Sequence, residues 1–244
     1  MLNGLPPMHT IRRAKRIPPK KNHSRCLFYC LYLNIFCHPV LQYGQDLTLM
    51  KSLSCDEPGL PLDILRRRYL ASCSQSMPVS GFLAWACLAL ASYGLGPRLP
   101  YYAYLIVAAI PLPLSIILDR MFGAPGLQRS ARHNPITQLF MNCITVTGLL
   151  IPFAILAGIA AHDPSLLMLG VGLYAGIVWV PHGWGADDRA GLIHFILRAA
   201  LCYAAYLLTP GWARQPAIAA AVAVSYLYEL IAMKKPASAR DGKS

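Results

Sequence analysis

Residues 135–161 read PITQLFMNCITVTGLLIPFAILAGIAA and contain no Asp, Glu, Lys or Arg. A helix that crosses the ~30 Å hydrocarbon core of a bilayer needs ~20 mostly apolar residues. This stretch meets that requirement and is long enough to cross at a tilt or to extend past the interface. It therefore predicts a membrane-spanning helix.

Five further stretches are mostly apolar and of similar length, and none of the six alternates with the two-residue period of a barrel strand. The six predicted spans are residues 77–95, 99–118, 135–161, 164–181, 192–208 and 216–233. The predicted fold is therefore all-α, a polytopic bundle of about six transmembrane helices within residues 77–233. We expect a polar and amphipathic approach (50–76) before the bundle and a basic tail (234–244) after it.

The composition of the whole chain agrees with a membrane protein. The chain is 56% hydrophobic and 13% charged, whereas soluble globular domains are about 25% charged. Too little polar surface remains to cover a water-soluble core. The composition also excludes a disordered chain, a collagen-like repeat and a small disulfide-stapled protein.

The Lys and Arg residues near the predicted spans gather on one side of the membrane. The other side has only Arg98 and Arg214. Because cytoplasmic loops carry an excess of Lys and Arg, both termini of the six-helix unit are expected to be cytoplasmic. The residues on that side are Lys51, Arg66, Arg67, Arg68, Arg120, Arg129, Arg132, Arg189, Lys234, Lys235, Arg240 and Lys243.

The first 49 residues differ from the rest of the chain. They are basic, and a short apolar run between Cys26 and Cys37 follows the basic part. One interpretation of this pattern is a signal peptide or signal anchor. However, no small-residue cleavage site follows, and a seventh span would put these charges on the wrong side. We therefore expect residues 1–49 to lie outside the fold, as upstream sequence before a start at Met50.

Two charged residues lie inside the predicted spans. Arg198 and Glu229 lie at depths of roughly 9 and 6 Å from the same end, at ~1.5 Å per helical residue. Charges inside a bilayer are costly and usually pair in the protein interior. The sequence therefore predicts an Arg198–Glu229 ion pair that is mainly structural. The alternative is a proton or substrate site.

Three more polar residues complete the candidate intramembrane cluster: His194, His182 and Asp119. Histidines and carboxylates together can bind a metal or relay protons. The spacing of His182, Asp187 and His194 fits no compact metal motif, so neither a metal nor a cofactor is predicted.

Small residues and prolines indicate how the helices pack. Gly172 and Gly176 form one small-residue face, and Ser225 lies on another, where helices in lipid can approach closely. Pro111 and Pro113 are expected to kink the second span.

No motif assigns an activity to the chain. GxSxG and HExxH motifs are absent from the sequence, so an enzyme is the least supported class. The basic residues flank the predicted spans, where the orientation of the protein in the membrane explains their excess on one side. Nucleic-acid binding is therefore not expected. The lipid bilayer is the expected partner, and the sequence predicts no particular protein partner. The preferred reading is a multi-pass membrane protein of unassigned function; the alternative is a small proton-coupled or small-solute transporter that uses Arg198 and Glu229.

Several short motifs between residues 62 and 233 carry a resemblance to a known family. They are Leu65-Arg66-Arg67-Arg68-Tyr69, Ser80-Gly81 with Trp85, His133-Asn134-Pro135, Tyr174-Ala175-Gly176 and Pro181-His182. On these motifs the stretch resembles a family of small bacterial integral-membrane proteins of unknown function, each with about six helices. The resemblance implies a bacterial inner (plasma) membrane and a start near Met50. It implies no activity and no site.

Overall fold

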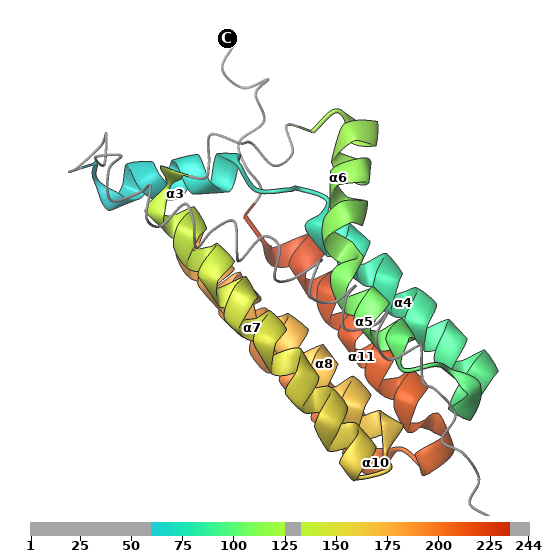
Figure 1. Cartoon of the computed structure of the whole chain (residues 1–244). Coiled ribbons are helices and arrows are strands. Elements are labelled where there is room, and N and C mark those ends of the chain that lie inside the picture. The colour runs from blue at the N-terminus through green and yellow to red at the C-terminus, as the bar shows by residue number, and fades with distance from the viewer. Residues whose placement is uncertain (1–59, 125–132, 235–244) are drawn as a thin grey trace, which may run out of the picture. The chain divides into compact units, whose positions relative to one another are not determined.

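The structure is a computed structural model, and it describes residues 60–124 and 133–234 (Figure 1). These residues form helices and no strand, which confirms the predicted all-α fold. The elements are α3 (Leu62–Ala71), α4 (Met77–Leu95), η2 (Gly96–Arg98), α5 (Tyr102–Ala109), α6 (Pro111–Phe122), α7 (Pro135–Ala160), α8 (Pro164–Ile177), α9 (Trp179–Gly185), α10 (Ala190–Leu208) and α11 (Gly211–Ala232). The predictions for residues 1–49, for 50–59 and for the tail after residue 234 lie outside the described residues.

Within residues 60–124 and 133–234, five helices are long and apolar enough to cross a membrane: α4, α7, α10, α11, and α8 continued by α9 as Pro164–Gly185. A sixth span is present if α5 and α6, which are bent by 40° at a short break, are counted together. The break falls at Ile110, directly before Pro111, where the prolines remove amide donors from the helix. The predicted kink in the second span is therefore confirmed.

Small residues set the closest helix contacts. Figure 1 shows α4 beside α11 and α7 beside α8, and α10 packs on both α8 and α11. A Cβ atom on Gly172 would lie 3.0 Å from Val222, and one on Gly176 would lie 2.8 Å from Cδ of Arg198. The predicted close approach at Gly172 and Gly176 is thus confirmed.

The helix α3 lies against α7 and α9 at one end of the bundle, which we call the α3 end. Asn134 caps the start of α7 through a hydrogen bond from the Ile136 amide, and its side-chain amide donates to the Leu65 carbonyl at 2.8 Å. Arg66 forms a salt bridge of 2.7 Å with Asp187, which follows α9. Polar contacts therefore fix α3 across the beginning of α7.

The outward faces of the long helices are apolar. On α7, Leu149, Phe153 and Leu156 are 63%, 64% and 63% exposed. Such a surface is unfavourable in water but is suited to lipid, where the backbone is already satisfied inside each helix.

Candidate functional site

The buried polar residues lie where α10 runs antiparallel to α11. Nδ1 of His194 is 3.1 Å from Oε1 of Glu229, and both side chains are fully buried. One turn further into the bundle, Nε of Arg198 donates a hydrogen bond of 3.0 Å to Oγ of Ser225. His194 is thus opposite Glu229, and Arg198 is opposite Ser225.

The predicted Arg198–Glu229 ion pair is wrong. No salt bridge joins the two residues in the part of the chain that the structure describes. The guanidinium of Arg198 instead lies 4.4 Å from the ring centroid of Tyr226. The depths that the sequence indicates differ by only a few ångströms, and the true register is shifted by one helical turn of ~5.4 Å.

Arg198 is completely buried, and Gly176 provides the space for its side chain. Its terminal nitrogens have no hydrogen-bond partner among the described residues. Arg198 therefore holds α10 to α11 through its Ser225 hydrogen bond and its contact with Tyr226. Both contacts depend on the planar guanidinium group.

An aromatic side chain connects the second histidine to this cluster. The ring of Trp179 lies 5.5 Å from the ring of His194 and 5.4 Å from that of His182. The Tyr69 hydroxyl and Nδ1 of His182 are hydrogen-bonded at 2.7 Å. Burial raises the pKa of Tyr69 well above its usual value, so Tyr69 stays neutral in this contact.

Asp119 has a different place in the fold. Its side chain is buried, and Oδ1 accepts a hydrogen bond of 3.1 Å from the amide of Ser76, directly before α4. A carboxylate there complements the N-terminal end of the helix dipole. Among the described residues, no hydrogen bond, salt bridge or ring contact joins Asp119 to the other four predicted cluster residues.

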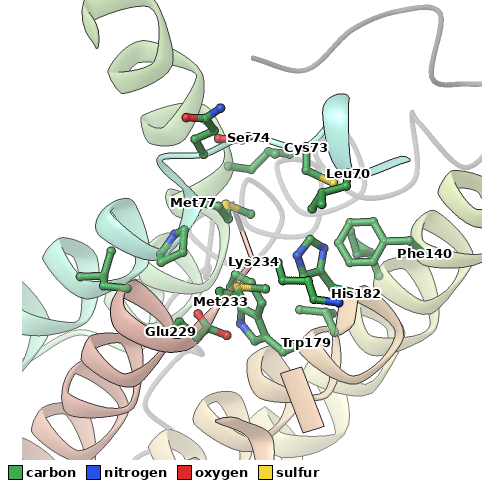
Figure 2. Close-up of a pocket in the computed structure, with 16 residues that line it drawn as sticks. Leu70, Cys73, Ser74, Met77, Phe140, Trp179, His182, Glu229, Met233 and Lys234 are labelled. Atoms are coloured by element: carbon green, nitrogen blue, oxygen red, sulfur yellow. The ribbon is translucent and has the colours of Figure 1, made fainter. Parts of the chain in front are cut away.

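A cavity of about 140 Å³ lies at the α3 end, next to the cluster (Figure 2). Glu229, Trp179 and His182 form part of its wall. Figure 2 shows the rings of Trp179 and His182 between Glu229 on α11 and Phe140 on α7. The rest of the lining is mostly apolar: Leu70, Cys73, Ser74, Gln75, Met77, Pro78, Leu112, Ile144, Val178, Leu230, Met233 and Lys234.

Sequence reasoning missed the aromatic part of the site. Trp179 and Tyr226 are large rings inside apolar spans, and nothing in a single sequence separates them from ordinary core residues. In the sequence, Tyr69 appears only as the last residue of the motif Leu65-Arg66-Arg67-Arg68-Tyr69, to which no role is attached. No group of three or more His, Cys, Asp or Glu residues in the ranges 60–124 and 133–234 is arranged to hold a metal ion.

One protein family matches most of the chain. Its model, described as a family of unknown function (DUF7010), matches residues 68–235. The match includes α4 to α11 and all five residues of the predicted cluster. No curated protein and no solved structure matches the chain. The chain belongs to the DUF7010 family of unknown function.

Proposed function

We propose that the protein is a multi-pass membrane protein that binds a small molecule in the cavity at the α3 end. The cavity itself is the observation that supports this function. Its volume of about 140 Å³ is close to that of an engineered apolar cavity of ~150 Å³ that binds benzene. Its wall combines many apolar side chains with few polar ones, including Glu229 and His182, which is typical of ligand sites.

The proposal also includes an orientation and a membrane. The α3 end would face the cytoplasm of a bacterium, from the inner membrane. Two observations support this: Arg66, Arg120, Arg189 and Lys234 belong to the α3 side of the predicted spans, and residues 62–233 resemble small bacterial membrane proteins. A reporter at the C-terminus that is active only outside the cytoplasm should stay silent.

In this proposal the side chain of Arg198 has a structural role, and the side chain of Glu229 faces the ligand cavity. Support comes from the contacts of Arg198 with Ser225 and Tyr226, which join α10 to α11. The transporter alternative gains no support from the described residues, so it is not part of the proposal.

The test fills the cavity and measures ligand stabilisation. A ligand that binds only the folded state raises its stability by RT ln(1 + [L]/Kd). We expect toluene to raise the unfolding temperature of the protein in nanodiscs, and Ile144→Trp to abolish that rise because Ile144 lines the cavity. Leu149→Trp is the matched control, because Leu149 is 63% exposed on the same helix. An equal rise in both variants would contradict the proposed binding site.

A further inference from the structure

The carboxylate of Glu229 joins the polar cluster to the cavity. Glu229 is 1% exposed, and it lines the cavity. Oε1 lies 3.1 Å from Nδ1 of His194, yet neither carboxylate oxygen accepts a hydrogen bond from any described residue. A buried acceptor without a donor is costly, so a ligand that brings donors to this carboxylate is favoured.

We propose that the ligand is a small primary amine, whose ammonium group binds the Glu229 carboxylate and whose apolar part fills the cavity. This inference rests on the proposed function. An ammonium group has three N–H donors and no acceptor, which suits a carboxylate whose oxygens accept no hydrogen bond from the described residues. Hydrogen bonds between two charged groups are stronger than those between neutral groups.

The rest of the wall suits an organic cation. Phe140, Trp179 and His182 contribute rings to the lining (Figure 2). Aromatic faces attract cations, and the effect is largest where water is excluded. The apolar side chains Leu112, Ile144 and Leu230 can cover a hydrocarbon part of benzene size.

The basic groups nearby do not favour an anion. Lys234 lines the cavity, but its ammonium group donates to the Asp187 carbonyl and its amide donates to Asp188 at 2.8 Å. Arg198 lies one turn deeper, opposite Ser225, and it is not among the described residues that form the wall. Glu229 is therefore the acidic side chain that a ligand meets among the described residues of the cavity wall.

The test is calorimetric titration of the full chain in phosphatidylcholine nanodiscs with four ligands of similar size. We expect benzylamine to bind at least tenfold more tightly than benzyl alcohol or toluene, and benzoate not to bind. Glu229→Gln should weaken benzylamine binding at least tenfold. The matched control is Asp163→Asn, which changes a carboxylate at the opposite end of the bundle, outside the cavity wall, and should leave binding unchanged.

The ranking in the unmodified protein decides the proposal even if a variant fails to fold. If toluene binds as tightly as benzylamine, the ligand is not selected by its ammonium group, and the amine proposal is wrong while the proposed function stands. Tighter binding of benzoate would overturn the amine in favour of an anion at Arg198. If no ligand binds, both the amine and the proposed function are wrong.

A primary ammonium group occurs both in free amines and in the headgroup of phosphatidylethanolamine. Nanodiscs that contain phosphatidylethanolamine distinguish the two sources. A weaker apparent affinity for benzylamine in those nanodiscs supports the lipid headgroup as the natural ligand. An unchanged affinity supports a free amine.

Discussion

Gly81 of α4 packs directly on the ring of Tyr226 in α11. A Cβ atom at position 81 would lie 2.4 Å from Cζ of that ring. On α11 the same ring lies under the guanidinium of Arg198, at 4.4 Å from its centroid. The contact between α4 and α11 therefore supports the side chain that holds α10 in place.

Replacing Gly81 by Ala should destabilise the bundle. The added methyl group cannot fit beside the Tyr226 ring, and overpacking of this kind costs about 1–3 kcal/mol. At Gly94, on the same helix, an added Cβ atom would meet nothing within 4 Å, and Gly94→Ala should stabilise by about 0.5–1 kcal/mol through helix propensity. Reversible unfolding in mixed micelles measures both changes. Equal effects at the two positions would contradict the close contact.

A double-mutant cycle should show coupling between Arg198 and Ser225. Hydrogen bonds to charged groups contribute about 1.5–3 kcal/mol. Arg198→Met and Ser225→Ala each remove the same contact, so the loss of stability in the double mutant should be smaller than the sum of the two single losses by about that amount. Ser115 is the control, because its buried hydroxyl donates to the Leu112 carbonyl of its own helix. Additive effects of the Arg198 and Ser225 changes on the free energy of unfolding would exclude the observed register.

The register between α10 and α11 could not be predicted from the sequence. The residue types that lie inside the spans can be identified from sequence, because charges stand out in apolar segments. Their pairing cannot, because a shift of one turn moves Arg198 from Glu229 to Ser225 and brings His194 to Glu229. The depth of a residue, counted from the predicted end of its helix, has an error of about one turn, ~5.4 Å, when that end is uncertain.

The helices themselves are largely predictable. Residues 77–95 form α4 with the predicted bounds, and the proline break falls in the predicted second span. The fifth span begins at Ala190, two residues before its predicted start at 192, and Gly191 in its first turn lets α10 lie close to the carbonyl of Trp179 in α9. Such a contact between segments depends on tertiary packing and leaves no periodic signal.

At the other end of the bundle, the stability contributed by Asp163 should depend on pH. Asp163 accepts hydrogen bonds from the Ser165 amide at 2.8 Å and from the Tyr206 hydroxyl at 2.9 Å. Burial alone would raise the pKa of Asp163, but these hydrogen bonds outweigh it and hold the pKa below 3.8. The stabilisation is therefore present above pH 3.8 and is lost as the pH falls through the lower folded-state pKa.

Tyr206→Phe should lower the free energy of unfolding by about 1 kcal/mol at pH 6, with a gap that closes as the pH falls below 3.8. Tyr203→Phe is the control, because Tyr203 is 49% exposed on the same helix. Unfolding titrations from pH 3 to 7 measure the gap. A gap that stays constant over this range would mean that the Asp163 contact is not the cause.

Cys73, in the wall of the cavity, should react slowly with alkylating reagents. Burial raises the pKa of its thiol to about 12, and only the thiolate reacts. In a variant with Cys73 as its single cysteine, the rate with iodoacetamide should rise tenfold per pH unit from pH 7 to 10 without a plateau. The same chain unfolded in detergent should approach a plateau near its ordinary pKa of 9.0. A plateau at that pH in the folded protein would contradict the burial of the thiol.

The most direct test of a ligand-binding cavity at the α3 end is protection of Cys73 by the ligand. The rate of modification by a methanethiosulfonate reagent is measured in the single-cysteine variant with and without saturating benzylamine, and with Ile144→Trp added. Saturating benzylamine should slow the modification at least tenfold, and it should have no effect once Ile144→Trp fills the cavity. An unchanged rate at saturating benzylamine would show that the ligand does not bind in this cavity.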